Sequence, residues 1–256
     1  MILSVKNLAV DYGKTNVVRN INFDLERGKI LAIVGESGSG KSTVLKAISG
    51  LLGRAGKISA GQVIFDGRDI TEIDDEERRK ISGESIAMIF QNATASFCPI
   101  RKIGEQIYES VREHKDRSES EFIERAKVFM KNIDLDESIL QEYPFRLSGG
   151  MGQRAGILAA MMLEPKLLLA DEPTSALDTI TQVGVVKELL KLRERQKISI
   201  LIVTHHPGVA RYISDYVLIM KDGNPVEFGT KDQIFDSPRE EYTRELTEAV
   251  SGNWKC

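Results

Sequence analysis

Residues 35–42 read GESGSGKS and decide the fold of this chain. They fit the pattern G-x-x-x-x-G-K-S in full, between an apolar, strand-like run at 30–34 and a helical run that ends near Gly50. Glycines let the backbone curl so that its N–H groups point inward, and the helix N-terminus adds positive potential. The stretch predicts a phosphate-binding loop. A glycine-rich turn without chemistry is the alternative, and the complete pattern in its strand-helix setting argues against it.

The chemistry of this loop follows from its last residues. Lys41 is expected to reach the β- and γ-phosphates of a nucleotide, and the hydroxyl of Ser42 can ligate Mg²⁺, which binds through few protein oxygens plus phosphate. The residues expected to bind ATP here are Gly35, Glu36, Ser37, Gly38, Ser39, Gly40, Lys41, Ser42 and Thr43.

A second acidic site stands at 167–173, where LLLADEP is an apolar strand that ends in two carboxylates. Ligands bind at the carboxyl ends of parallel strands. Asp171 can then hold Mg²⁺ through water, and Glu172 can orient or deprotonate the water that attacks the phosphate. The alternative is that both carboxylates only cap a turn before Pro173. The phosphate loop in the same chain favours the catalytic interpretation.

Composition sets limits on the class of protein. The chain has 256 residues, 41% hydrophobic and 29% charged, which suits a globular α/β protein with a large core. A net charge of −3 argues against a dedicated nucleic-acid binder. Two cysteines, Cys98 and Cys256, are too few for a disulfide framework and favour a reducing compartment. No secretory signal and no apolar run of about 18 residues is present, so membrane association would need a partner.

The order of apolar runs predicts alternating strands and helices after a β-rich start. Such alternation implies a mostly parallel sheet. Charged residues dominate 103–140, where apolar positions recur at helical spacing, which indicates a helical insertion. The strands are expected at 2–10, 17–25, 30–34, 62–65, 86–90, 166–170, 199–203, 215–220 and 225–228, and the later helices at 153–163, 181–196 and 231–250.

Between the two sites, LSGGM at 147–151 precedes Gln153 and Arg154, and here the chain resembles the ABC ATPase family over nearly its whole length. The resemblance implies that Ser148, Gly149 and Gly150 clamp the γ-phosphate bound to an opposite subunit. It also implies a P-loop NTPase, RecA-like core with a mostly parallel sheet, an N-terminal antiparallel β subdomain and an inserted α-helical subdomain. The expected division of this single domain is 1–91 and 157–230 for the core with the β subdomain, 92–156 for the helical signature subdomain and 231–256 for a helical tail.

Other positions match the family one by one. Tyr12 resembles the aromatic residue that stacks on adenine, and Gln91 resembles the glutamine that senses Mg²⁺ and the membrane partner. His205 resembles the switch histidine at the γ-phosphate, although the residues alone do not decide between it and His206. The stretch 175–178 resembles the loop that crosses the dimer interface. The resemblance thus assigns catalysis to Lys41, Gln91, Glu172 and His205, and Mg²⁺ to Ser42, Gln91 and Asp171.

Finer details resemble the peptide and nickel importer branch of the family. These are Met151, Ser96, Pro99, Thr181, Gln182, Pro238, Tyr242, Thr243 and Leu246. Gly152, where a larger residue is usual, His206, where aspartate is usual, and the stretch 93–98 depart from the pattern. The resemblance leaves open whether the cargo is a dipeptide, an oligopeptide or a nickel chelate.

The resemblance implies an ATPase that works at the cytoplasmic face of a membrane with ATP and Mg²⁺. Its expected partners are a second cassette, either an identical copy or a paralogue, two transmembrane permease subunits and, indirectly, an extracytoplasmic solute-binding protein. No nucleic-acid partner is expected. Two alternatives remain: a non-transport ABC ATPase that acts on nucleic acid or ribosomes, and a regulatory nucleotide binder without turnover.

Overall fold

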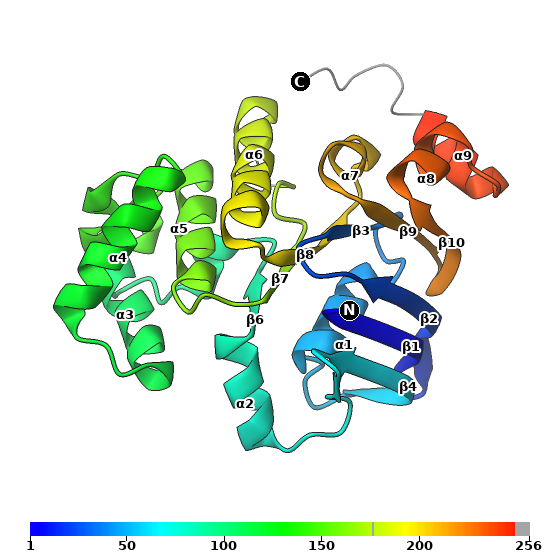
Figure 1. Cartoon of the computed structure of the whole chain (residues 1–256), viewed down its shortest axis with the longest axis horizontal. Coiled ribbons are helices and arrows are strands. Elements are labelled where there is room, and N and C mark those ends of the chain that lie inside the picture. Colours follow the sequence, from blue (N-terminus) through cyan, green and yellow to red (C-terminus); the bar gives the residue numbers. More distant parts are fainter. Residues whose placement is uncertain (176, 249–256) are drawn as a thin grey trace.

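A six-stranded sheet with strand order β10-β9-β3-β8-β7-β6 runs through the centre of the computed structural model, which describes residues 1–175 and 177–248 (Figure 1). Strands β6, β7, β8, β3 and β9 are parallel, and β10 pairs antiparallel to β9. The strands are β3 (Ile30–Val34), β6 (Ile86–Ile89), β7 (Leu167–Asp171), β8 (Ser199–Thr204), β9 (Tyr216–Lys221) and β10 (Asn224–Thr230). The predicted mostly parallel sheet is confirmed.

A second, antiparallel sheet has the order β2-β1-β4-β5. Its strand β4 begins at Gly56, earlier than the expected 62–65. The register slips around Gly61, whose φ is +88° and where a Cβ would lie 2.4 Å from the carbonyl oxygen of Asn7. This bulge breaks the apolar alternation and hides the first half of the strand. The strands are β1 (Leu3–Tyr12), β2 (Thr15–Leu25), β4 (Gly56–Phe65) and β5 (Arg68–Asp69).

Helices cover the central sheet and extend to one side of it. Helices α3 and α4, which lie in the expected helical insertion at 103–140, gather with α5 at the left of Figure 1. The helix α2 was not expected, because Ile81, which is only partly buried, is its single large apolar residue. The helices are α1 (Lys41–Ser49), α2 (Asp75–Glu84), α3 (Ile103–His114), α4 (Glu119–Asn132), α5 (Gly149–Met161), α6 (Thr179–Gln196), α7 (Pro207–Ile213), α8 (Lys231–Asp236) and α9 (Glu241–Glu248).

Two hydrophobic cores lie on opposite faces of the central sheet. Alternate residues of β3 illustrate the division: Ile30, Ala32 and Val34 belong to the core that contains α3 to α6, whereas Leu31 and Ile33 belong to the core that contains β1, β2 and α1. Both faces of the strand are therefore packed, as expected for a continuous apolar run in a parallel sheet. We call the core that contains α3 to α6 the helical core and the core that contains β1, β2 and α1 the β core.

Within the described residues, the expected helical tail at 231–250 consists of two short helices. Helix α8 ends before Ser237 and Pro238, because proline lacks the N–H that would continue the helix. Helix α9 then begins beside β10, where the Glu227 carboxylate accepts hydrogen bonds from the backbone N–H groups of Arg239 and Glu240. The rest of the tail, with Cys256, lies outside the described residues. The division into subdomains at the expected boundaries stays a prediction.

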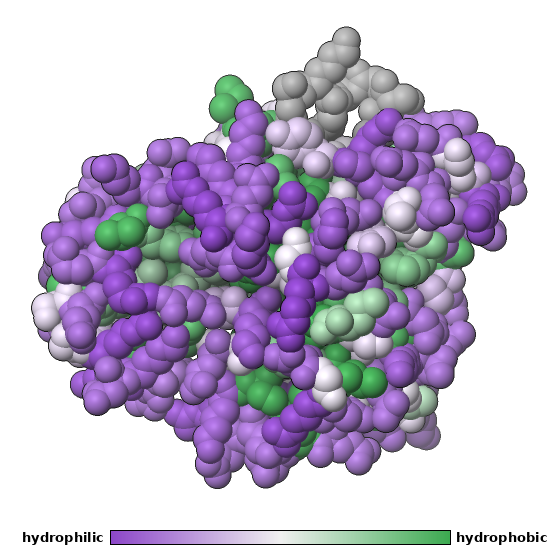
Figure 2. All heavy atoms as spheres, viewed as in Figure 1, coloured by the Kyte–Doolittle hydropathy of each residue, from purple (hydrophilic) through white to green (hydrophobic). Residues whose placement is uncertain are grey.

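The face drawn in Figure 2 is mainly hydrophilic. On the face drawn in Figure 2, apolar side chains form small separate patches between charged and polar ones. Among the residues that the structure describes, no helix combines the length and the apolar character that crossing a membrane requires.

Candidate nucleotide-binding and hydrolysis site

The loop 35–42 lies between β3, which is buried along its whole length, and α1. Gly38 and Gly40 have φ values of +84° and +93°, in the left-handed region that favours glycine. A Cβ on Gly35 would lie 2.2 Å from the Met220 carbonyl oxygen, so the loop also needs glycine where it passes β9. The side chain of Ser39 is buried, and its Oγ has no hydrogen-bond partner among the described residues. The loop therefore has the left-handed glycine turns and the helix N-terminus that suit a phosphate chain.

The side chain of Lys41 lies along the inside of this loop. Its Nζ donates hydrogen bonds to the carbonyl oxygens of Gly35, at 2.9 Å, and Glu36, at 2.6 Å. Burial lowers the pKa of Lys41, against the opposing effects of Glu172, Asp171 and Glu36. The lysine is thus a fixed cationic group at the place where a phosphate chain would lie.

Ser42 and Asp171 meet across the site. The Oγ of Ser42 donates a hydrogen bond of 2.7 Å to Oδ1 of Asp171, at the end of β7. Asp171 is only 8% exposed, and burial raises its pKa, whereas the bond from Ser42 lowers it. Within the described residues no group of three or more His, Cys, Asp or Glu is arranged to hold a metal. A hydroxyl beside one carboxylate nevertheless fits Mg²⁺, which completes its coordination with water and phosphate oxygens.

The ends of β6, β7 and β8 bring three further predicted residues together. Oε2 of Glu172 lies 3.0 Å from Nδ1 of His205 and accepts a hydrogen bond of 3.2 Å from Nε2 of Gln91. Gln91 also donates to Oγ of Ser175, at 3.3 Å. Glu172 has a φ of +43°, which is uncommon for a residue other than glycine and is often found at functional sites. Its carboxylate is therefore held in one place by residues that follow the ends of two other strands, β6 and β8.

A cavity of about 910 Å³ joins the phosphate loop to these strand ends. Of the predicted residues, the structure brings to its wall Glu36, Ser37, Gly38, Gly40, Lys41, Ser42, Thr43, Gln91, Glu172 and His205. Val17 and Ser175 also line it. Val17 was not predicted, because a valine in a strand carries no signal that separates it from a core residue. Gly35 and Ser39 of the loop and Asp171 at the end of β7 are not among the described residues that line the cavity.

Four predicted nucleotide-binding residues outside the phosphate loop are also not among the described residues that line this cavity. Tyr12 lies at the end of β1, packed at the edge of the β core near Gly56. Ser148, Gly149 and Gly150 lie at the start of α5, where Oγ of Ser148 accepts a hydrogen bond from the backbone N–H of Met151 at 3.3 Å. Their roles stay predictions. In the expected dimer loop, Ala176 lies outside the described residues.

Of the two adjacent histidines, His205 and not His206 is among the described residues that line the cavity. Burial lowers the pKa of His206, and the neighbouring His205 lowers it further. Its backbone N–H donates to Oγ1 of Thr204 at 3.0 Å, and α7 begins directly after it. The position of His206 indicates a role in this strand-to-helix turn, whereas His205 lies beside Glu172.

Gly152 and the segment 93–98, which both depart from the family pattern, are in contact near Gln91. A Cβ on Gly152 would lie 1.8 Å from Oγ1 of Thr94, in the short 3₁₀ helix Ala93–Ser96, and a Cβ on Gly156 would lie 2.5 Å from Cβ of Ala93. Because Gly152 and Gly156 carry no side chain, the segment after Gln91 packs directly on this face of α5. The close approach of Thr94 therefore accounts for the small residue at position 152, next to the unusual segment 93–98.

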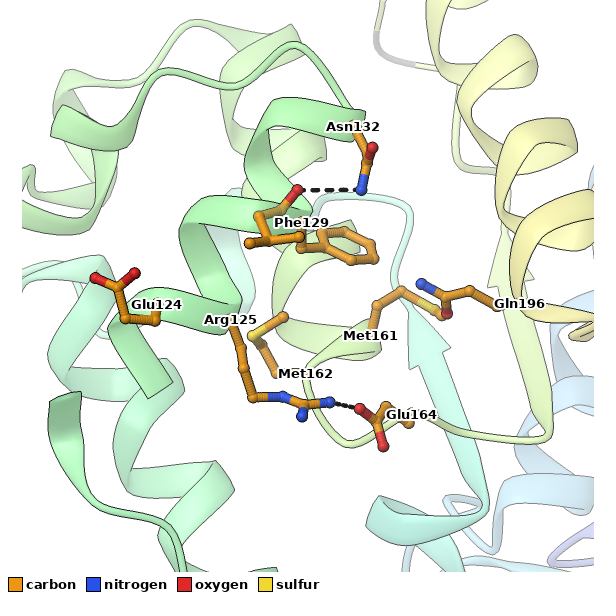
Figure 3. A pocket seen from close by; sticks show the side chains of 9 residues that line it. Glu124, Arg125, Phe129, Asn132, Met161, Met162, Glu164 and Gln196 are labelled. Carbon is orange, nitrogen blue, oxygen red and sulfur yellow. Dashed lines mark hydrogen bonds and ion pairs between the residues drawn. The ribbon is translucent and has the colours of Figure 1, made fainter. Parts of the chain in front are cut away.

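A second cavity, of about 420 Å³, lies between α4 and the ends of α5 and α6 (Figure 3). Phe129, Met161 and Met162 line it, and the ion pair between Arg125 and Glu164 lies at its edge. This hollow is mainly apolar, and its charged pair is already satisfied. The cavity at the phosphate loop is therefore the one equipped for chemistry.

Comparison with known proteins agrees with this geometry. The family described as "ABC transporter" matches residues 18–175. The dipeptide transport ATP-binding protein DppD of Lactococcus lactis subsp. cremoris is 40% identical over 256 residues, which cover 97% of this chain and 73% of that protein. The glutathione import ATP-binding protein GsiA of Escherichia coli K12 is 40% identical over 97% of this chain, which spans only 42% of its length.

The solved structures extend the match to the fold. A dimeric, post-hydrolysis ATP-binding cassette, MJ0796, bound to ADP and Pi superposes with a TM-score of 0.80 at 30% identity, covering 90% of this chain and 98% of the other. The matched family segment includes the phosphate loop and the strand that carries Asp171 and Glu172. This chain therefore belongs to the ABC transporter family, as an ATP-binding cassette and ATPase.

Proposed function

We propose that this cassette hydrolyses ATP to drive the import of peptides through separate membrane subunits. The observation that carries the proposal is the convergence of Lys41, Glu172 and His205 on one cavity beside a complete phosphate loop. The direction of transport and the cargo rest on the relatives, whose names refer to dipeptide transport and glutathione import. These names favour peptides over nickel chelates as cargo.

Hydrolysis requires a water molecule to attack the γ-phosphate of ATP. Glu172 orients this water and accepts its proton, while His205 and Gln91 hold the accepting carboxylate in place at 3.0 and 3.2 Å. Lys41 and the N–H groups of the loop stabilise the negative charge on the transferred phosphoryl group. Because such catalysis is mainly positioning and electrostatic stabilisation, the fixed neighbours of Glu172 support its role as the base.

Ser42 and Asp171 are the residues that would hold Mg²⁺, and their 2.7 Å contact supports this assignment. The metal, when bound, supplies positive charge that neutralises the phosphate oxygens. Gln91, the third predicted ligand, directs its amide nitrogen at Glu172, so its carbonyl oxygen is the atom that would face a metal.

A dimer is part of the proposal. The signature residues Ser148, Gly149 and Gly150 lie outside this chain's own cavity, at the N-terminus of α5, where free N–H groups suit an anion. They would then act on ATP held by a second cassette, either an identical copy or a paralogue. MJ0796, the solved relative bound to ADP and Pi, is dimeric.

Two permease subunits are the proposed membrane partners. The cassette would bind them at the cytoplasmic face of the membrane and would be linked to a solute-binding protein only through them. A groove of about 490 Å³ beside Gln91 supports a docking place. Phe90, which is 40% exposed, Phe97 and Ile107 line it, and Arg101 and Glu109 form an ion pair there. An inserted permease segment would touch the residue that precedes Gln91, so motion could pass from the site to the membrane.

The test uses the tagged full-length chain, expressed with its co-encoded neighbours and purified from membranes. Two membrane proteins should co-purify with it, and short peptides should stimulate ATP turnover of the complex, whereas nickel chelates should not. For the dimer, the variant E172Q should dimerise with ATP, and the added substitution Ser148→Arg should prevent this.

Different outcomes would contradict different parts of the proposal. Binding of a nucleic-acid duplex at physiological salt, with no membrane protein recovered, would favour the alternative of a non-transport ATPase. Stimulation by nickel chelates alone would overturn the proposed cargo and leave the ATPase chemistry intact.

A further inference from the structure

The C-terminal part of the chain is built against the outer side of the phosphate loop. The turn between β9 and β10 donates a hydrogen bond from the backbone N–H of Gly223 to the carbonyl oxygen of Ser39, at 3.2 Å. The Met220 carbonyl oxygen, at the end of β9, lies where a side chain on Gly35 would have to pass. The loop is thus supported along its backbone by the last strands of the central sheet.

Helix α9 adds one side-chain contact to this support. The hydroxyl of Tyr242 donates a hydrogen bond of 3.2 Å to Oε1 of Glu36, a residue of the loop that lines the cavity. Nζ of Lys221, the last residue of β9, lies 4.3 Å from the centre of the Tyr242 ring. The Glu36 carboxylate is therefore held on the side of α9.

The helix that carries Tyr242 is itself firmly placed. The Glu227 carboxylate binds the two backbone N–H groups just before α9. Thr243, next to the tyrosine, is fully buried, and Leu246 packs against the helical core. Tyr242 is therefore a fixed donor, and not a surface side chain that meets the loop by chance.

The contact between Tyr242 and Glu36 matters because Glu36 carries a negative charge beside the phosphate site. Glu36 adds a carboxylate to a loop whose task is to bind a strongly anionic triphosphate, and its own carbonyl oxygen accepts from the Lys41 ammonium. A carboxylate that rotates into the cavity would repel the phosphates, because like charges a few ångströms apart repel each other even where, as at the exposed Glu36, salt weakens the effect. A neutral donor that holds the carboxylate aside removes this repulsion without taking Lys41 from the nucleotide.

We propose that Tyr242 is a positioning residue for ATP binding, which restrains the Glu36 carboxylate away from the triphosphate and so couples helix α9 to nucleotide affinity. The inference rests on the proposed site, since it takes the cavity at Lys41 to be the place of the phosphates. The burial of Tyr242 and the proximity of Glu36 raise the pKa of the tyrosine, so the hydroxyl stays protonated and able to donate.

The test compares ATP affinity and turnover of full-length variants. Tyr242→Phe keeps the ring and its contact with Lys221 and removes only the donor. We expect a three- to ten-fold increase in the KM for ATP, with kcat unchanged, and an equal loss of affinity for a fluorescent ATP analogue. In the Glu36→Gln background the same substitution should change the KM less than two-fold, because no charge remains to be restrained.

A matched control is present at the other end of β9. The hydroxyl of Tyr216 donates a hydrogen bond of 3.0 Å to Glu26, away from the site, so Tyr216→Phe should leave the KM unchanged. Raising the salt concentration from about 0.1 to about 1 M should reduce the defect of Tyr242→Phe, because salt screens charge repulsion. A purely structural role would give a defect that persists in the Glu36→Gln background and at high salt.

The outcomes separate the two claims. A wild-type chain that does not bind ATP, or a Lys41→Ala variant that binds it as well as wild type, would remove the proposed site itself. An active wild type together with an unchanged KM in Tyr242→Phe would overturn the role of Tyr242 and leave the site intact.

Discussion

Nδ1 of His205 lies 3.0 Å from Oε2 of Glu172, and the two residues come from the ends of neighbouring parallel strands, β8 and β7. Gln91, just beyond β6, donates to the same carboxylate oxygen at 3.2 Å. One oxygen of Glu172 is thus fixed by two neighbours, and the proposed function assigns the other oxygen to the attacking water. A small change to this carboxylate should therefore affect turnover and not nucleotide binding.

The first prediction concerns Glu172→Gln. The amide keeps the shape of the side chain but cannot accept a proton, so ATP turnover should fall by about 10²- to 10⁴-fold, the usual contribution of a general base. Affinity for ATP should stay within about two-fold of wild type. Steady-state phosphate release and equilibrium nucleotide binding measure the two effects. Glu76→Gln, on exposed helix α2, is the control, and turnover near wild type in Glu172→Gln would remove the catalytic assignment.

The second prediction concerns the pH dependence of stability. Burial raises the pKa of Asp171 above its ordinary value of 3.8, so the folded state binds the proton more tightly than the unfolded state. This carboxylate therefore favours folding at pH values below 3.8, and that contribution is lost as the pH rises through the raised, folded-state pKa. At neutral pH, Asp171→Asn removes the buried charge and can still accept the hydrogen bond from Ser42.

We accordingly expect the Asp171→Asn variant, measured without nucleotide or metal, to have a higher Tm than wild type at pH 7. The difference should shrink as the pH approaches 4. Thermal unfolding at several pH values measures it. A Tm below that of wild type at pH 7 would show that the charge is stabilised in the fold, against the stated direction.

The third prediction concerns the contact between Gly152 and Thr94. Gly152→Ala would place a Cβ 1.8 Å from Oγ1 of Thr94, so it should lower the free energy of unfolding by about 1–3 kcal/mol, as overpacking does. Thr94→Ala removes that oxygen and leaves its own Cβ 3.2 Å from the new methyl group, so the double variant should recover most of the loss. Chemical denaturation of the four chains completes the cycle.

The matched control is Gly184→Ala, also within a helix. Its Cβ would meet only the end of the Arg154 side chain, at 3.3 Å, and alanine is favoured over glycine there by up to about 1 kcal/mol. This variant should be at least as stable as wild type. Equal destabilisation at both glycines, or no recovery in the double variant, would show that Thr94 is not the cause.

Most of the core of the fold could be predicted from the sequence, because local patterns report it. The strand 30–34 and the helix that follows Gly40 are marked by an apolar run and by glycines with a fixed spacing, and the structure confirms both. The grouping of Gln91, Glu172 and His205 follows from the rule that parallel strands end at one edge of a sheet. The roles of these residues remain predictions.

The remaining features depend on contacts that no local pattern records. Helix α2 has a single large apolar residue, Ile81, and so no periodic signal. Gly152 is unusual in the sequence, and only the approach of Thr94, far away in the chain, gives its reason. The same holds for Val17 in the cavity wall and for the bond from Tyr242 to Glu36. Each of these arises from tertiary packing between segments distant in sequence.

The central sheet, which both cores share, also determines how the molecule unfolds. In β7, Leu168 and Ala170 face the helical core, and Leu167 and Leu169 face the β core. If one core unfolded, one face of the central strands would be exposed to water while the other face still packed against the second core. Because these strands are apolar on both faces, unfolding of one core alone would expose apolar surface to water. We therefore expect the two cores to unfold as one cooperative unit. A destabilising substitution in either core should then also destabilise the strand ends that carry the site.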